Sequence, residues 1–456
     1  MPENHSDVLV LGGGSGGYSC AIRSAQLGLS VIVVEEDKLG GTCLHRGCIP
    51  TKALLHSAEA ADTVRHSEQF GVRSVLGGID MPAVHEYKRS TVQRLYAGLE
   101  GLLKRHDVTV VHGRGLYRGD RTVAVGNQDY TGSSLVVATG SAPRSIPGIE
   151  LGPRIATSDQ ALELAETPER VVVLGGGVIG LEFASIWRSF GAEVTIVEAL
   201  PRLASAEDPW SSAAVERAYR KRGITVRTSV SVVSATETHD HVHIVLDNGD
   251  TLAADLLLVA VGRSPRVDGL RLTEHGIEID RGFVSTNESL QTSVPGVYAV
   301  GDVVRGLQLA HRGFQQGIFV AEHIAGHDPH PGDESSIPRI TYSHPEIASV
   351  GLTEGSAREQ YGDIDVATYD LAGNGKSQIL KTAGGVKVIR VAGGPIVGVH
   401  MVGDRVGELV GEAQLLVAWE AVPEDVAPFV HAHPTQNEAL GEALMVLGGK
   451  PLHAHR

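Results

Sequence analysis

Two stretches of the sequence share one plan, and this duplication limits the folds that the chain can adopt. One reads DVLVLGGGSGGYSCAIRSAQLGLSVIVVEED near the N-terminus, and the other reads RVVVLGGGVIGLEFASIWRSFGAEVTIVEA from Arg170. Each begins with an apolar strand, passes through a glycine turn of the GxGxxG type, and continues as an amphipathic helix and a second strand. Such units build parallel sheets covered by helices, so the sequence predicts an α/β protein with two Rossmann-like domains.

Within each copy, the glycines and a later acidic residue have the spacing of a dinucleotide site. The glycines allow the backbone to approach a pyrophosphate, the helix N-terminus faces the phosphates, and the acid accepts hydrogen bonds from ribose hydroxyls. The acid of the second copy favours NAD over NADP because it would repel a 2′-phosphate, with Arg202 nearby as an opposing charge. The residues are Gly12, Gly14, Gly17 and Glu35 in the first copy, and Gly175, Gly177, Gly180 and Glu198 in the second.

The length and charge of the chain narrow the possible functions. At 456 residues, the chain is longer than a single hydrophobic core usually supports, so several domains are expected. A formal net charge of -15 argues against a nucleic-acid surface, and no apolar run is long enough to cross a bilayer. The first residues, MPENHSDVLVLGGG, have no basic segment before the apolar strand, so no signal peptide is predicted and the cytoplasm is the expected compartment.

The segment GGTCLHRGCIPTK holds two of the three cysteines in the chain. In a reducing compartment a close pair is more often catalytic or metal-binding than structural, and no companion ligands suggest a metal site. A straight helix would separate the α-carbons of Cys43 and Cys48 by about 7.5 Å, too far for a disulfide, so the helix must be interrupted. Gly47 and Pro50 indicate that a helix begins close to Cys48, whose thiol pKa the helix end would lower. We interpret the pair as a redox disulfide and Cys20, on the first helix, as a core residue.

Several blocks along the whole chain resemble the pyridine nucleotide-disulfide oxidoreductases, and within that family the members that oxidise dihydrolipoyl groups. Besides the cysteine segment and the two glycine turns, the blocks are VVATGS, VAVGRSP, VPGVYAVGDVVRGLQLAH, YSHPEIASVGLTE and HAHPTQNEALGEA. The resemblance implies FAD on the first fold, NAD on the second, and an α+β C-terminal domain that forms a homodimer.

The resemblance also implies how the chain divides into domains. Residues 1–147 would form the first segment of the FAD domain, which carries the disulfide, and residues 148–267 would form the NAD domain. Residues 268–333 would return to the FAD domain, and residues 334–456 would form the interface domain.

The family's functional residues can be placed on matching positions of this sequence. Cys43 is implied to be the thiol that exchanges with the substrate, and Cys48 the thiolate that contacts the flavin. Lys52 and Glu182 are implied to form a pair near the flavin ring. The other implied cofactor contacts are Thr42, Gly115, Thr139, Asp302 and Ala310 for FAD, and Gly262 for NAD.

A general base is implied near the C-terminus. His433 of the HPT motif corresponds to that base and Glu438 to the acid that orients it, and in the family this pair reaches the disulfide of the other subunit. Chemically the role is needed, because a thiol becomes a strong nucleophile only after it loses its proton. Three other histidines are interpreted as surface groups: His431, His453 and His455.

The implied reaction is the oxidation of protein-bound dihydrolipoyl groups by NAD+ through the disulfide and FAD. Expected partners are the lipoylated acyltransferase core of a 2-oxoacid dehydrogenase complex or the carrier protein of the glycine cleavage system. The main alternative is reduction of another small disulfide or a quinone, as in a glutathione-reductase-like or diaphorase enzyme. Glu198 disfavours the former, which normally uses NADPH, and the tail KPLHAHR lacks the cysteines of a mercuric reductase.

Five positions depart from the pattern of dihydrolipoyl-oxidising enzymes. His45 and Arg46 replace Asn and Val between the cysteines, Ser15 replaces Pro, and Gln315 and Gln316 stand where acids are frequent. These changes are expected to place two basic side chains beside the disulfide and to affect its potential and substrate preference.

Overall fold

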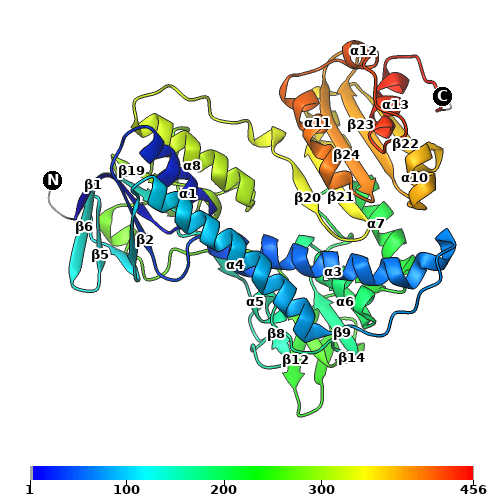
Figure 1. Cartoon of the computed structure of the whole chain (residues 1–456), viewed down its shortest axis with the longest axis horizontal. Helices are drawn as coiled ribbons and strands as arrows, with labels where there is room; N and C mark the ends of the chain where they lie inside the picture. The colour runs from blue at the N-terminus through cyan, green and yellow to red at the C-terminus, as the bar shows by residue number, and fades with distance from the viewer. Residues whose placement is uncertain (1–3, 455–456) are drawn as a thin grey trace.

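The computed structural model describes residues 4–454, which form three main sheets and their covering helices (Figure 1). The first sheet has the order β3-β2-β1-β6-β5-β4, with β19 paired to β6. Residues 8–11 of β1 and the first four residues of β2 are apolar and buried, as expected for parallel strands that helices shield from solvent. Its strands are β1 (His5–Leu11), β2 (Val31–Glu35), β3 (Thr109–His112), β4 (Gly115–Tyr117), β5 (Thr122–Val125), β6 (Gln128–Val137) and β19 (Val297–Ala299).

The first sheet is assembled from two segments that lie far apart in the sequence. Strand β19 runs parallel to β6 although the whole second unit lies between them in the chain. The helix α8 (Ala310–Ile324), which follows β19, packs closely against α1 (Ser15–Gln26). The glycines Gly16 and Gly317 allow this approach, since a Cβ on either residue would collide with the facing helix or with Val300.

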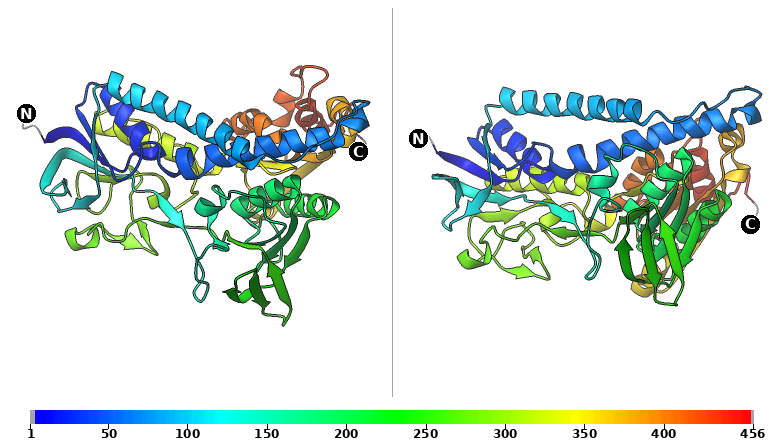
Figure 2. Two further views of the ribbon diagram at one scale, coloured as in Figure 1. Left: turned by 60° about the horizontal axis from the view of Figure 1, so that its bottom comes forward. Right: turned by 90° about the horizontal axis from the view of Figure 1, so that it is seen from below.

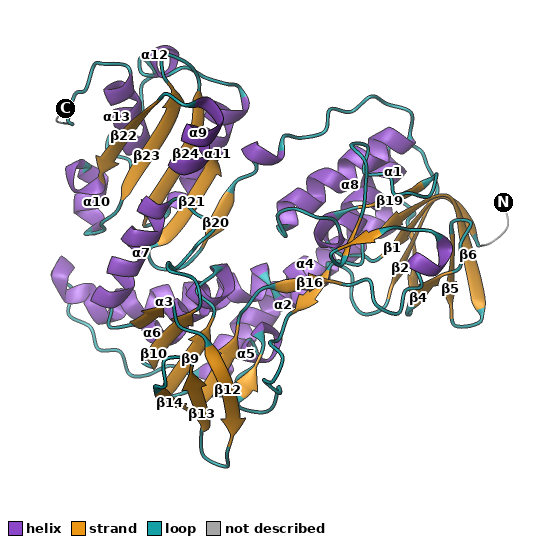
Figure 3. Cartoon of the chain, turned by 180° about the vertical axis from the view of Figure 1, so that it is seen from behind, coloured by secondary structure: helices purple, strands orange, loops and turns teal. Residues whose placement is uncertain are grey.

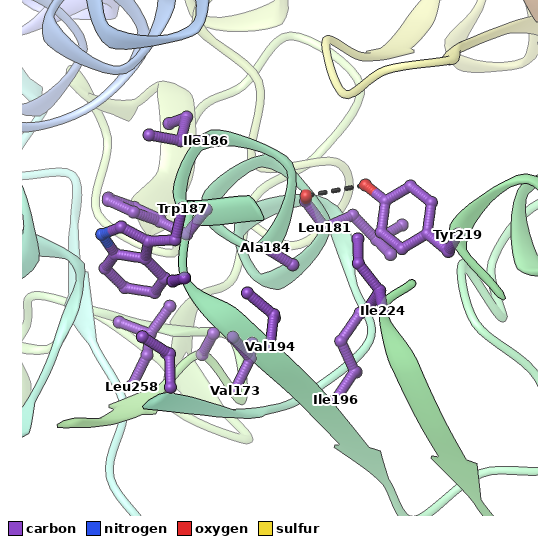
Figure 4. Packing of buried hydrophobic residues seen from close by; sticks show 14 of the residues in the cluster. Val173, Leu181, Ala184, Ile186, Trp187, Val194, Ile196, Tyr219, Ile224 and Leu258 are labelled. Atoms are coloured by element: carbon purple, nitrogen blue, oxygen red, sulfur yellow. Dashed lines mark hydrogen bonds between the residues drawn. The ribbon is translucent and has the colours of Figure 1, made fainter. Parts of the chain in front are cut away.

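The second unit is a five-stranded sheet of order β11-β10-β9-β15-β8. Figure 4 shows its core, where apolar side chains of α6 pack on the sheet and the Tyr219 hydroxyl donates a 2.7 Å hydrogen bond to the Leu181 carbonyl oxygen. Its elements are β8 (Ile155–Ala156), α5 (Ser158–Ala161), β9 (Arg170–Leu174), α6 (Val178–Phe190), β10 (Glu193–Glu198), α7 (Pro209–Lys221), β11 (Thr225–Thr228) and β15 (Leu256–Val259), with a separate sheet of β12 (Val232–Glu237), β13 (Val242–Leu246) and β14 (Thr251–Ala254).

The C-terminal unit is an antiparallel sheet of order β20-β21-β24-β23-β22 with helices against it. The elements are β20 (Arg339–Thr341), β21 (Glu346–Gly351), α9 (Glu354–Tyr361), β22 (Ile364–Asp370), α10 (Gly375–Leu380), β23 (Gly385–Val391), β24 (Ile396–Gly403), α11 (Val406–Ala418), α12 (Pro423–Val426) and α13 (Glu438–Leu447).

Two long helices tie the units together. Helix α3 (Cys48–His66) starts at the first unit and packs against α6 of the second, and α4 (Met81–Arg105) runs alongside it (Figure 2). Strand β7 (Ser141–Pro143) pairs with β16 (Arg263–Pro265), so the chain leaves and re-enters the first unit at one place. In the described part of the chain, no helix is both long and apolar enough to cross a membrane.

Candidate active site

The two cysteines lie at a break between two helices, as the sequence predicts. Helix α2 (Gly41–Arg46) carries Cys43, Gly47 interrupts it, and α3 begins at Cys48. Both residues are thiols in this structure, and the Cys43 thiol hydrogen-bonds to Cys48. That hydrogen bond, with help from Lys52, lowers the pKa of Cys48 to about 7, whereas the pKa of Cys43 is raised well above its usual value. Of the two sulfurs, Cys48 is therefore the one that carries negative charge near neutral pH.

Lys52 is held one turn further along α3 by an acid of the second unit. Its Nζ donates 2.9 Å hydrogen bonds to both carboxylate oxygens of Glu182 on α6, whose side chain is only 4% exposed. Burial lowers the pKa of Lys52, but the Glu182 carboxylate, with smaller contributions from Cys48 and Tyr342, outweighs this effect, so the net shift is upward. Lys52 also lies 4.7 Å from the ring centroid of Tyr342, whose backbone N–H donates to Glu182.

The first glycine turn has the shape that a bound dinucleotide requires. Gly12 has a φ of +104°, and a Cβ on Gly17 would collide with the Gly12 carbonyl oxygen, so both positions need glycine. The Gly13 N–H donates a 2.7 Å hydrogen bond to Glu35, and burial raises the pKa of that carboxylate. Gly140 and Gly301 each have open space where a Cβ would stand, which leaves room for FAD.

The remaining residues implied for FAD occupy loops and element ends of the first unit. Asp302 accepts a 2.6 Å hydrogen bond from the Ser141 hydroxyl, and Thr139 donates to the Arg266 carbonyl oxygen. Thr42 follows the glycine that begins α2 and accepts a hydrogen bond from Arg263. Gly115 begins β4 and Ala310 begins α8. Sequence reasoning did not single out Arg263, because its contacts join segments far apart in the chain.

The second glycine turn repeats the first in detail. Gly175 has a φ of +110°, and a Cβ on Gly180 would collide with the Gly175 carbonyl oxygen. The Gly176 N–H donates a 2.6 Å hydrogen bond to Glu198 at the end of β10. Gly262, which also has a positive φ, lies just beyond β15. At Gly177, no atom lies within 4 Å of the position that a Cβ would take, so this turn is open for NAD.

His433 and Glu438 form a pair, as the resemblance implies. The Nδ1–H of His433 donates to Glu438 at 2.8 Å, so in a neutral ring Nε2 is the nitrogen that can accept a proton. The second Glu438 oxygen accepts the Thr435 N–H. The His433 side chain is 75% exposed. Within one chain, the structure does not bring the pair to the cysteines, because α13 and α2 lie well apart (Figure 3).

The interpretation of His431 as a surface group is wrong. Its side chain is only 14% exposed, and Nε2 donates a 2.9 Å hydrogen bond to Glu412 on α11, which raises the pKa of His431. Tertiary packing of α11 against the loop produces this burial, and no local sequence pattern marks it. His453 is largely exposed and pairs with Glu442, and His455 lies outside the described residues.

His45 and Arg46, the two substitutions between the cysteines, each contact a neighbouring polar group. His45 donates from Nε2 to the Leu39 carbonyl oxygen at 2.8 Å, and burial lowers its pKa, which favours the neutral ring. Arg46 forms an ion pair with Asp37. Two basic groups were expected beside the disulfide. The structure instead places one cation there, Arg46, and its charge is paired with Asp37. Gln316 accepts a 2.8 Å hydrogen bond from the Gly301 N–H.

Metal coordination has no evident support in the described residues. Between residues 4 and 454, no group of three or more His, Cys, Asp or Glu side chains is arranged to hold a metal ion.

Comparison with known proteins agrees with this arrangement. The pyridine nucleotide-disulphide oxidoreductase family matches residues 6–317, and its dimerisation domain matches residues 337–444. The chain therefore belongs to the pyridine nucleotide-disulphide oxidoreductases, and the predicted α/β fold with a C-terminal dimerisation domain is confirmed. Within the family its activity is that of a dihydrolipoyl dehydrogenase, which oxidises dihydrolipoyl groups and reduces NAD+ to NADH with FAD as cofactor.

Relatives of that name match nearly the whole chain. Dihydrolipoyl dehydrogenase of Bacillus subtilis is 40% identical over 468 residues, covering 98% of this chain and 99% of the relative. Mitochondrial dihydrolipoyl dehydrogenase 1 of Arabidopsis thaliana is 38% identical, covering 99% of this chain and 92% of the relative.

Solved structures show the same fold. LpdA from Mycobacterium tuberculosis superposes with a TM-score of 0.90 at 24% identity, covering 96% of this chain and 99% of that one. The HOCl-induced flavoprotein disulfide reductase RclA from Escherichia coli superposes with a TM-score of 0.87 at 25% identity, covering 96% and 99%. The dimerisation domain supports a homodimer.

Proposed function

We propose that Cys43 exchanges with the dihydrolipoyl substrate and that Cys48 is the sulfur that leaves as a thiolate. The observation that carries this division is the position of Cys48 at the first residue of α3, one turn before Lys52, where the helix end and the positive charge of Lys52 favour a thiolate and lower the Cys48 pKa. In thiol–disulfide exchange, a sulfur whose thiol has a low pKa leaves faster. Lys52, held by Glu182, stabilises the negative charge that develops on Cys48.

We further propose that His433 is the general base, oriented by Glu438. Its Nδ1–H is engaged by the carboxylate, so Nε2 is the nitrogen that takes a proton from the attacking substrate thiol. The high exposure of His433 on one chain is what a group that serves the partner subunit's disulfide requires. The pair is therefore proposed to complete the site across the dimer.

The thiol–disulfide exchange takes two steps and begins from the disulfide form of the enzyme, in which Cys43 and Cys48 are bonded. The first substrate sulfur, deprotonated by His433, attacks Cys43; a mixed disulfide forms and Cys48 departs with the electron pair of the broken S–S bond. The second substrate sulfur then attacks the mixed disulfide, which releases lipoyl and leaves the enzyme as a dithiol that holds two electrons. FAD, which the first glycine turn would hold, would supply the two-electron chemistry that links this dithiol to the reduction of NAD+.

Both nucleotides are proposed to occupy the glycine turns. FAD would be held by the first turn with Glu35, Thr42, Gly115, Thr139, Asp302 and Ala310, and NAD by the second turn with Glu198 and Gly262. The domain limits predicted from the sequence, with a break in the FAD domain from 148 to 267, are part of this proposal. Pairing of β19 with β6 supports such a return.

The partner and compartment are proposed on the activity of the relatives. A dihydrolipoyl group attached to the acyltransferase core of a 2-oxoacid dehydrogenase complex, or to the carrier protein of the glycine cleavage system, is the proposed physiological substrate. The cytoplasm is the proposed compartment, because a cysteine pair that alternates between dithiol and disulfide during catalysis is typical of a reducing compartment.

Anaerobic rapid mixing of the FAD-loaded dimer with dihydrolipoamide tests these roles. The dithiol should give the long-wavelength absorption of a thiolate beside oxidised flavin, and this band should decay on addition of NAD+ but not of NADP+. Cys48→Ser should abolish the band. If the wild-type dimer gives no band while NADH still reduces its flavin, the disulfide serves another substrate, such as the small disulfide or quinone of the alternative.

A further inference from the structure

The loop that follows Glu198, residues 199–208, closes over the second glycine turn. The Ala204 N–H donates a 2.8 Å hydrogen bond to the Gly176 carbonyl oxygen, and the Leu200 N–H donates a 2.7 Å bond to Glu198. The Leu203 side chain is fully buried and packs on Gly176, where a Cβ would collide with it. The loop therefore touches both the turn and the acid that face the nucleotide.

The first glycine turn is closed in the same way by a different segment. There the Gly40 N–H donates a 2.8 Å hydrogen bond to the Gly13 carbonyl oxygen, and Leu39 packs on Gly13. That segment continues directly into α2 and the cysteines, whose helices hold it in place. The 199–208 loop continues instead into α7, with Asp208 as the N-cap, and its far end is also held by another domain.

The far end of the loop carries two consecutive buried acids. Asp208, with a side chain 0% exposed, accepts hydrogen bonds of 2.9 Å from Lys387 Nζ on β23 and from the Glu354 N–H at the start of α9. Its neighbour Glu207 pairs with Arg339 on β20 at 3.2 Å.

Further contacts complete the anchor at this boundary. Glu207 also accepts a hydrogen bond from the Ser349 hydroxyl on β21, and Lys387 forms a second ion pair, with Glu354 at 2.8 Å. Figures 1 and 3 show α7 of the second unit, which begins immediately after Asp208, lying on the side of that unit that faces the C-terminal sheet.

We propose that Lys387 and Arg339 of the dimerisation domain are positioning residues for the NAD site. They hold Glu207 and Asp208, which fix the 199–208 loop, and the loop holds Gly176 and Glu198 in the conformation that receives the nucleotide. Both charges of the Lys387–Asp208 pair are almost fully desolvated, so removing one leaves the other buried without its partner and favours rearrangement of the loop. This inference rests on the proposed assignment of Glu198 and its turn to NAD.

The test replaces Lys387 with methionine in the FAD-loaded dimer and measures ADP-ribose binding by calorimetry. ADP-ribose has the adenosine and pyrophosphate of NAD but accepts no hydride, so binding is measured apart from turnover. Lys387→Met should raise the Kd by at least about fivefold, the lower end of the coupling usual between linked sites. The KM for NAD+ should rise with it, whereas the KM for dihydrolipoamide and the rate of the thiolate band should not change.

Arg390→Met is the matched control. Arg390 lies on the same strand β23, has an 11% exposed side chain against 6% for Lys387, and pairs with Asp365 and Glu424 inside the C-terminal unit. This variant should lose stability without weakening ADP-ribose binding. Arg339→Gln is the second test variant and should act like Lys387→Met if the latter does not fold.

Three outcomes separate the proposal from its alternatives. If Lys387→Met and Arg339→Gln lower Tm as Arg390→Met does but leave the Kd of ADP-ribose unchanged, the anchor is only structural and the inference fails. If those two variants leave the Kd unchanged but Glu198→Ala weakens ADP-ribose binding, only the positioning role fails and the NAD assignment stands. If Glu198→Ala also binds ADP-ribose normally, the NAD assignment fails, and the positioning role fails with it.

Discussion

Replacing Lys52 with methionine should raise the pKa of the Cys48 thiol. Cys48 has a pKa of about 7 against an ordinary value of 9.0, a difference of about 3 kcal/mol in favour of the thiolate at 1.36 kcal/mol per pKa unit. The hydrogen bond from Cys43 is the main cause, and the positive charge of Lys52 is the next favourable one, while Glu182 opposes both. Methionine keeps roughly the length of the lysine side chain and removes its charge together with its two hydrogen bonds to Glu182.

The expected size of the change follows from the usual effect of a nearby opposite charge, about one pKa unit or more. At pH 7 the thiolate fraction of Cys48 should then fall from about one half to about one tenth. The sign is fixed, since a thiol is charged above its pKa, so the variant should recover its thiolate at higher pH. Glu182→Gln removes the charge that raises the pKa and should shift the value downward.

The assay is a pH titration of the dithiol enzyme, followed anaerobically through the thiolate–flavin absorption band. Lys52→Met should move the midpoint up, Glu182→Gln should move it down, and the double variant should lie between them. Arg46→Met is the control, because Arg46 is a neighbouring cation that pairs with Asp37 and is not among the causes of the Cys48 shift. A midpoint for Lys52→Met that is unchanged or lower would refute the electrostatic role assigned to this lysine.

Three further changes probe other parts of the site. His433→Ala should reduce kcat for dihydrolipoamide by about 100-fold or more, while NADH oxidation by ferricyanide, which needs no thiol exchange, continues; equal loss of both would contradict the base assignment. Glu198→Ala should raise the KM for NAD+ and lower the ratio of kcat/KM for NAD+ to kcat/KM for NADP+ in steady-state assays. If this ratio is unchanged, the role assigned to Glu198 is contradicted. Gly180→Ala should lower Tm by about 5 °C or more, because its methyl group collides with Gly175, whereas calorimetric scans of Gly177→Ala should show no change.

Sequence reasoning found the parts of the site whose residues lie close together along the chain. Gly47 and Pro50 predict the helix break between the cysteines because local backbone preferences determine it. The two glycine turns and their acids are found for the same reason. Lys52 and Glu182 are 130 positions apart, so resemblance to the family was needed to pair them, and the structure shows the contact.

The parts that were missed depend on the packing of distant elements. Tyr342 lies over Lys52, and Lys387 reaches Asp208 across 179 positions, so no periodicity or spacing connects the partners. His431 was misjudged for a related reason, since its burial depends on a glutamate of α11. The domain limits and the roles of single site residues stay predictions until the variants are measured.

The exposure of His433 has a consequence for how activity is distributed over the dimer. If each site takes its cysteines from one chain and its imidazole from the other, a His433→Ala chain paired with a Cys48→Ser chain forms one intact site and one site that lacks both groups. Two inactive variants produced together in one cell should therefore regain about a quarter of wild-type turnover, since half of the dimers would be mixed and each would hold one working site. If the base acted within its own chain, producing the two variants together would restore no turnover. Recovery of turnover would therefore show that two chains build each site.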